Sequence, residues 1–309
     1  PNDLPASKIL KEENIFVMDE TRALSQRIRP LKLIIVNIMP TKIVTETQLL
    51  RLLSNTPLQI EVDWLCMESH NSKNTSQEHL MEFYKTFNEI KDNKYDGLIV
   101  TGAPVEKLKF EDVDYWNELT NIFDWANTNV FSSFFICWAS QASLYYYYGV
   151  EKYQLKEKLT GVYHHHTNPE KMRRRILRGF DYQFYAPHSR YTSVKKEDIE
   201  KIDSLDILAS SNDAGVYLVA EKDGSRFFVT GHPEYDPDTL DKEYHRDLAK
   251  GGDCVMPKNY YKNDDVNDEI LVKWRSHAYL LFSNWLNYYV YQNTPYNLDD
   301  LLKMKTTNK

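Results

Sequence analysis

A stretch that passes from a strand-like run into a helix-like run around one cysteine constrains the fold more than any other feature. Apart from two serines, residues 130–136 (VFSSFFI) are apolar, aromatic or β-branched, which is typical of a buried strand. Residues 138–144 (WASQASL) favour a helix, which Gly149 would end as a C-terminal cap. Cys137 lies at the junction. A sharp turn there would lift its thiol out of the sheet and direct the positive end of the helix at it, which stabilises a thiolate. The alternative is a buried structural cysteine, the more common kind.

Strand-like and helix-like segments alternate through the first half of the chain. The predicted strands are residues 31–39, 59–67, 97–101 and 130–136, and the predicted helices are residues 43–53, 76–87 and 113–125. This alternation predicts an α/β fold with a mostly parallel sheet and helices on both faces. Ligands bind at the carboxyl ends of the strands in such sheets. Met39-Pro40, Thr101-Gly102 and Cys137 fall at such ends, so we expect them to converge.

The chain is predicted to form one domain preceded by an arm. Residues 1–30 are expected to be an extended N-terminal arm, with Pro5 and Pro30 as breakers. Residues 31–309 contain no repeat, low-complexity tract or linker, so a single α/β domain with a C-terminal helical elaboration is expected. Its later elements are shorter strands at residues 205–209, 216–220 and 226–230 and an aromatic helix over about 268–291.

Composition excludes several classes of protein. Of 309 residues, 42% are hydrophobic and 13% aromatic, enough to bury a large core. The formal net charge of −7 argues against general nucleic-acid binding. No apolar run reaches the length of a membrane span and the first residues lack the apolar core of a signal peptide, so a cytoplasmic protein is expected. Cys66, Cys137 and Cys254 are too few and too scattered for a disulfide framework or a zinc site.

A second motif supplies partners for Cys137. Residues 226–230 lead into Gly231-His232-Pro233-Glu234, and side chains two residues apart on an extended chain face the same side. If that face meets Cys137, His232 would move the proton of the nucleophile and Glu234 would orient the imidazole. An ordinary hydrogen-bonding histidine is the alternative for His232.

Acyl transfer through a cysteine also requires donors for the developing oxyanion. The Gly102-Ala103 turn is one candidate, because glycine lets the backbone approach a ligand closely. The backbone N–H of Trp138 is the other. One such donor contributes about 3–4 kcal/mol in the transition state.

Longer strings are similar to a known family. The turn cysteine, the Gly-His-Pro-Glu motif and the flavodoxin-like pattern of elements resemble the class I glutamine amidotransferase superfamily. Strings such as NIMPTKIVTETQLLRLLSNTPLQ, DGLIVTGAP, CWASQA, APHSRY and VTGHPEYD resemble the homoserine O-acyltransferases of methionine biosynthesis (the MetA family) over about residues 4–296. The resemblance implies transfer of an acyl group from acyl-CoA to the γ-hydroxyl of L-homoserine through an acyl-cysteine, with no bound cofactor and no metal.

The resemblance also implies roles for single residues. Cys137 would be the nucleophile, His232 the general base and Glu234 the carboxylate that orients it. Arg246 would bind the carboxylate of homoserine through two parallel hydrogen bonds. Lys158 and Ser189 match substrate-binding positions, and Lys42 matches a family lysine near the active site. Without the motif match, Lys158 and Arg246 would be taken for ordinary surface charges.

Glu106 bears on which acyl-CoA is the donor. Family members with glycine at its position are associated with succinyl-CoA and those with glutamate with acetyl-CoA. A glutamate would repel the carboxylate of a succinyl group and fill its space, although Lys107 could pair with Glu106 and soften this repulsion. Acetyl-CoA is therefore the predicted co-substrate, succinyl-CoA the alternative, and an amidotransferase-like cysteine hydrolase or a non-catalytic binding protein more distant ones. A homodimer is a family-level expectation.

Two polar runs are set aside. Adjacent side chains point in different directions, so His164, His165 and His166 are not expected to share a metal ion. Residues 171–178 are rich in Lys and Arg and could contact coenzyme A phosphates, but a solvated charged face is the more common explanation.

Overall fold

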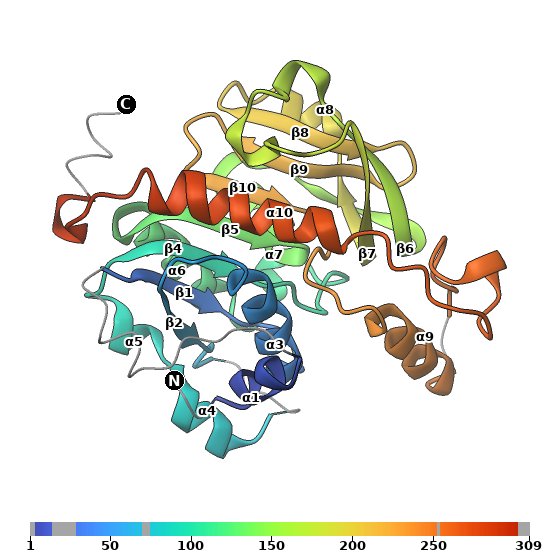
Figure 1. Cartoon of the computed structure of the whole chain (residues 1–309), viewed down its shortest axis with the longest axis horizontal. Helices are drawn as coiled ribbons and strands as arrows, with labels where there is room; N and C mark the ends of the chain where they lie inside the picture. Colours follow the sequence, from blue (N-terminus) through green and yellow to red (C-terminus); the bar gives the residue numbers. More distant parts are fainter. Residues whose placement is uncertain (1–3, 14–28, 70–74, 252–253, 302–309) are drawn as a thin grey trace.

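The computed structural model describes residues 4–13, 29–69, 75–251 and 254–301, and Figure 1 shows a twisted central sheet with helices on both faces. The strands are β1 (Leu31–Val36), β2 (Ile60–Leu65), β3 (Tyr84–Lys85), β4 (Tyr95–Val100), β5 (Val130–Ile136), β6 (Lys152–Thr167), β7 (Gln183–Val194), β8 (Leu205–Ser211), β9 (Gly215–Glu221) and β10 (Arg226–Val229). The α-helices are α1 (Pro5–Glu12), α3 (Lys42–Leu53), α4 (Gln77–Phe83), α5 (Phe87–Ile90), α6 (Trp116–Asn129), α7 (Trp138–Tyr148), α8 (Lys196–Glu200), α9 (Thr239–Ala249) and α10 (Arg275–Trp285). None of the described helices is long and apolar enough to cross a membrane.

The strands form one sheet in the order β3-β2-β1-β4-β5-β10-β9-β8-β6-β7. The half from β3 to β10 is parallel. The half from β10 to β7 is antiparallel. The predicted α/β fold with helices on both faces is confirmed, and the alternating sequence pattern predicted the parallel strands β1, β2, β4 and β5. The predicted helix 76–87 was too long: α4 ends at Phe83, because Tyr84 and Lys85 form β3 by pairing with β2 at the edge of the sheet.

Each face of the parallel half has its own core because side chains alternate along a strand. Leu33 and Ile35 of β1 pack into the core beneath α3 and α10, whereas Ile34 and Val36 pack into the core beneath α6 and α7. Gly97 of β4 leaves room for α10, since an added Cβ would lie 2.9 Å from the ring of Trp285.

Both ends of the chain differ from the expectation. The start of the expected extended arm is helical: α1 packs on α3 with Leu4, Ala6 and Leu10 buried. Pro5 begins this helix rather than breaking structure, because the first helical position needs no N–H donor. Residues 14–28 of the arm lie outside the described residues, and the division into an arm and one domain stays a prediction.

The C-terminal helix is shorter than expected at its start. It begins at Arg275 rather than near residue 268, after Trp274 has buried its side chain and donated from Nε1 to the carbonyl of Tyr235 at 3.1 Å. It continues as a π-helical segment, Leu286–Tyr291. The tryptophan therefore connects the start of α10 to the chain that follows β10, next to the candidate site.

Candidate active site

Cys137 forms the turn between β5 and α7, as predicted. Its backbone has φ 51° and ψ −115°, a conformation that residues other than glycine rarely adopt and that costs about 1–3 kcal/mol. Hydrogen bonds stabilise this strained conformation. The Cys137 N–H donates to Val229 O at 2.7 Å, and the Cys137 carbonyl accepts from the N–H and the hydroxyl of Ser140 at 3.0 and 2.6 Å. Gly149 ends α7 in the left-handed region, with φ 70°. The thiol is thus fixed at the positive end of a helix.

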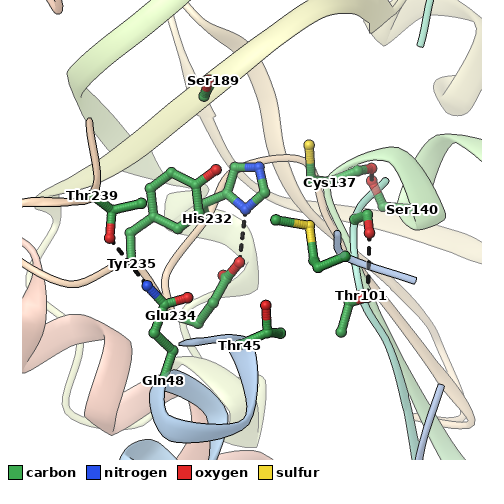
Figure 2. A network of polar contacts seen from close by, with 12 residues as sticks. Thr45, Gln48, Thr101, Cys137, Ser140, Ser189, His232, Glu234, Tyr235 and Thr239 are labelled. Atoms are coloured by element: carbon green, nitrogen blue, oxygen red, sulfur yellow. Dashed lines mark hydrogen bonds and ion pairs between the residues drawn. The ribbon is translucent and has the colours of Figure 1, made fainter. Parts of the chain in front are cut away.

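His232 and Glu234 interact as the sequence predicted. His232 Nδ1 lies 2.7 Å from Glu234 Oε1, and the side chains of both residues are buried. The imidazole also stacks on the ring of Tyr235, with centroids 4.1 Å apart and planes 17° apart. The N–H of His232 donates to Pro187 O at 2.8 Å. With Nδ1 occupied by the carboxylate, Nε2 is left for Cys137, and Figure 2 shows the ring between Glu234 and the thiol.

The electrostatics favour a charged imidazole. Burial opposes the imidazolium, but the charge of Cys137 and the carboxylate of Glu234 outweigh it and raise the pKa of His232 well above its ordinary value. A histidinium beside the thiol is the arrangement that maintains a cysteine thiolate in a buried site.

Gly102, Ala103 and Trp138 carry the backbone N–H groups proposed for the oxyanion. An added Cβ on Gly102 would lie 3.3 Å from both Cys137 Cβ and His232 Cε1, so any larger residue would crowd both side chains. Trp138 is the first residue of α7. Within the described part of the chain, no backbone hydrogen bond uses these three N–H groups.

A cavity of about 210 Å³ opens beside Cys137 and His232. Its lining residues are Met39, Pro40, Ala103, Pro104, Glu106, Cys137, Lys158, Ser189, Tyr191, His232, Tyr235, Glu243, Arg246 and Asp247. The cavity therefore brings together the candidate nucleophile, the candidate base, the three candidate substrate-binding residues and the candidate donor selector.

Glu243 is the centre of a polar network that the sequence analysis missed. It accepts hydrogen bonds from the hydroxyls of Ser189 at 2.5 Å and Tyr235 at 2.7 Å. Lys158 Nζ lies 3.7 Å from it and donates to Asp247 at 2.8 Å. Glu243 and Asp247 lie four residues apart on α9, so both face the cavity, and this helical spacing was the signal that could have found them.

Arg246 also belongs to α9 and lines the cavity. Its guanidinium donates to Asp247 Oδ1 through Nε and Nη2, at 3.0 and 2.8 Å. Its side chain is 52% exposed, so donors remain available at the cavity.

Glu106 is half-buried and faces the same cavity. Burial raises the pKa of its carboxyl above the ordinary value, while His232 and Lys158 oppose the rise. The Lys107 ammonium lies 4.1 Å from the ring centroid of Tyr191, and no ion pair joins it to Glu106 among the described residues. Lys152 Nζ donates to the backbone carbonyl of Glu106 at 2.7 Å, which fixes the loop.

Lys42 supports the site from behind rather than lining it. Its Nζ donates to Asn37 O at 2.5 Å and Met39 O at 3.4 Å, and Met39 and Pro40 line the cavity. Burial lowers the pKa of Lys42 to about 8, partly offset by Cys66 and Glu46.

The polar runs set aside above lie away from the cavity lining. His165 is buried against His188, whereas His164 and His166 pack against each other with ring centroids 4.7 Å apart. No cluster of His, Cys, Asp or Glu suited to a metal ion occurs among the described residues. Lys171 pairs with Asp206 at 2.8 Å, so part of the basic run is structural.

A sequence model of the homoserine O-succinyltransferase family (HTS) matches residues 1–296. The chain belongs to this family. A homoserine O-acetyltransferase from Catenibacterium mitsuokai is 72% identical over 306 residues, covering 99% of this chain and 98% of that protein. Homoserine O-acetyltransferases from Petrotoga mobilis and Acetivibrio thermocellus are 59% and 58% identical, each over 97% of this chain and at least 97% of the relative.

Comparison with solved structures shows which known fold this chain shares. A glutamine amidotransferase from Thermotoga maritima superposes with a TM-score of 0.54 at 12% identity, over 84% of this chain and 97% of the other. A glutamine amidotransferase from Methylobacillus flagellatus gives 0.52 at 11% identity, over 84% and 94%. These likenesses confirm the predicted amidotransferase-like fold.

Proposed function

We propose that this chain is a homoserine O-acetyltransferase that moves an acetyl group from acetyl-CoA to the γ-hydroxyl of L-homoserine. The observation that carries the proposal is the single cavity that holds Cys137, His232 and the carboxylate of Glu106. The names of its relatives, identical at 58–72% of positions, point to the same reaction.

The first half-reaction would load the enzyme. The Cys137 thiolate attacks the thioester carbonyl of acetyl-CoA, and the N–H groups of Gly102, Ala103 and Trp138 stabilise the oxyanion. The tetrahedral intermediate collapses, the C–S bond to coenzyme A breaks, and His232 gives its proton to the leaving thiolate. One thioester replaces another, so a cysteine suits this step.

The second half-reaction would unload it. His232, now neutral and held in one tautomer by Glu234, takes the proton of the γ-hydroxyl of homoserine. The alkoxide attacks the acyl-cysteine, the C–S bond breaks, and O-acetyl-L-homoserine leaves with the thiolate restored. The buried His232–Glu234 pair contributes in both directions because the base of one step is the acid of the other.

The remaining cavity residues fit an amino-acid substrate. Arg246 offers donors for the α-carboxylate, and Glu243 offers a carboxylate for the α-ammonium. Ser189 is already bonded to Glu243, so it would orient that carboxylate as well as contact the substrate. Lys158 balances the charge of Glu243 and Asp247.

The choice of donor rests on Glu106. The family bears the name of succinyl transfer, yet the three relatives described above are named for acetyl transfer. Succinyl transfer is therefore the second candidate. The half-buried carboxylate of Glu106 favours the uncharged acetyl group, because a succinyl carboxylate would be placed in the same small cavity. A homodimer and a cytoplasmic location stay predictions.

A coupled assay tests the proposal. The full chain is incubated with acetyl-CoA and L-homoserine, coenzyme A release is followed with a thiol reagent, and the product is identified by mass. C137A is expected to lose at least about 10³-fold in kcat, while the matched control C254A, a cysteine outside the cavity lining, keeps wild-type turnover. Turnover by C137A, or hydrolysis of L-glutamine in place of acyl transfer, would overturn the proposal.

A further inference from the structure

Arg190 is a buried cation without a carboxylate partner. Its residue is 1% exposed, and its guanidinium donates to the carbonyls of Thr192 and Ala214 at 2.7 and 2.5 Å and to His188 Nδ1 at 3.4 Å. All three acceptors are neutral. Removing a cation from water without an opposing charge costs several kcal/mol, so such a group persists for a reason other than packing.

The other buried cations of the described chain avoid this cost. Arg51 is paired with the carboxylates of Glu13 and Asp236. Lys42 has a pKa lowered to about 8, so it can release its proton. An arginine cannot, because the guanidinium stays protonated in proteins.

The histidines beside Arg190 are fixed in the neutral state. Because Arg190 Nε donates to His188 Nδ1, His188 must donate from Nε2 to His165 Nε2, which lies 3.0 Å away. His165 then donates from Nδ1 to Tyr163 O at 2.9 Å. In this chain of hydrogen bonds, each donor faces an acceptor while both histidines stay neutral. Burial lowers the pKa of His165 to about 3 and that of His188 well below its ordinary value.

The string connects directly to the first turn of α7. Gln141 Nε2 donates to the same Thr192 carbonyl that accepts from Arg190, and Thr192 Oγ1 donates back to Gln141 Oε1 at 2.8 Å. Gln141 lies one helical turn after Cys137 and donates its N–H to the carbonyl of Cys137. The neighbours of Arg190 on β7, Ser189 and Tyr191, line the cavity, whereas Arg190 points to the opposite side of the strand, toward α7.

We infer that Arg190 is a positioning residue that supplies a fixed positive charge behind the turn at Cys137. It stabilises the negative charge on the thiolate before attack and on the oxyanion after it. Because it is held by backbone carbonyls and neutral histidines, its charge is not cancelled locally and no reorganisation is needed when charge develops. This inference rests on the proposed nucleophilic role of Cys137.

The test compares variants that differ in charge. The rate of Cys137 alkylation by iodoacetamide is measured against pH for the wild type, R190K and R190Q, with the modified residue identified by peptide mass. Both variants lose hydrogen bonds of the guanidinium, but only R190Q loses the charge. We expect R190Q to react about 3- to 30-fold more slowly below the midpoint of its curve, with the midpoint moved to higher pH. R190K should fall between the wild type and R190Q, because a buried lysine, unlike arginine, releases its proton as the pH rises.

A purely structural role gives a different result. It would lower the thermal midpoints of both variants and leave their alkylation curves superimposable on that of the wild type, which would overturn the inference. If R190Q does not fold, R190M is measured in trimethylamine N-oxide, which favours folded states. Alkylation needs no acyl-CoA, so a failure of the proposed acyl transfer and a failure of the Arg190 inference are read separately.

Discussion

The charge of Glu106 predicts how this enzyme would be converted to succinyl transfer. Replacing Glu106 by Gly removes both the carboxylate and its volume from a cavity of about 210 Å³. Replacing it by Gln removes only the charge. If repulsion decides the donor, both variants gain succinyl-CoA activity; if space decides, E106G alone gains it.

The magnitude follows from Coulomb's law. Two carboxylates about 5 Å apart, at an effective dielectric constant of about 20, repel by about 3 kcal/mol, or roughly 10²-fold in rate. The positive charges of His232 and Lys158 act on Glu106 and reduce this figure, so it is an upper bound. We therefore expect the ratio of kcat/KM for succinyl-CoA to that for acetyl-CoA to rise by up to about 10²-fold in E106Q and at least as much in E106G.

The same reasoning predicts a pH dependence. Burial raises the pKa of Glu106, so its carboxyl is protonated at a less acidic pH than an exposed glutamate. Protonation removes the repulsion, so the succinyl-to-acetyl ratio of the wild type should rise as pH falls, and this slope should vanish in E106Q and E106G. Steady-state kinetics with both donors from about pH 5 to 8 measure it. Unchanged ratios in both variants, at every pH, would refute this account of donor choice.

Further predictions concern the triad, two glycines and a buried histidine. E234Q should lower kcat about 10²- to 10⁴-fold with little change in KM, because His232 loses the carboxylate that fixes its tautomer; an unchanged kcat would refute the triad. G149A should lower the unfolding free energy by about 1 kcal/mol, since φ is 70° but no atom lies within 4 Å of the added Cβ. G161A should lower the unfolding free energy several times more, because a backbone oxygen lies 2.3 Å from the added Cβ. Equal thermal midpoints of the two variants would contradict this. The pKa of His165 is lowered to about 3 in the folded protein, so the unfolded chain binds more protons between about pH 6.5 and 3. The unfolding free energy should therefore fall on acidification through that window, by at most about 5 kcal/mol. In denaturant melts, H165F should flatten this dependence of stability on pH.

Local signals in the sequence were enough to predict most of the parallel half and the turn at Cys137. The run into Cys137 combines a mostly apolar strand with a helix and a glycine cap, and all three appear in the structure. His232 and Glu234 are separated by two positions of an extended segment, so their 2.7 Å contact depends on local geometry alone.

In the antiparallel half, β8 and β9 were predicted at residues 205–209 and 216–220, but β6 and β7 were not. The first half of β6, rich in Lys and Glu, is exposed or half-buried, and its pairing with β7 shifts register between Gln154 and Leu159. A strand that is stabilised by pairing with its neighbour, rather than by burying an apolar face, shows little hydrophobic periodicity in its sequence.

The substrate side of the cavity depends on contacts between distant segments. Lys158 of β6 meets Asp247 of α9 across 89 positions, and Ser189 meets Glu243 across 54. Neither pairing has a local pattern. Family resemblance pointed to Lys158, Ser189 and Arg246, but not to the carboxylates that hold them in place.

The acyl-cysteine can be detected by intact-protein mass spectrometry after a brief exposure to acetyl-CoA without homoserine. We expect an acetyl adduct on Cys137 that is discharged by added L-homoserine, with no comparable adduct from succinyl-CoA at the same concentration. The control C137A should take up no label at this position, and C254A should label as the wild type does. A stable adduct that homoserine does not discharge, or labelling of C137A equal to that of the wild type, would contradict a transfer that passes through Cys137.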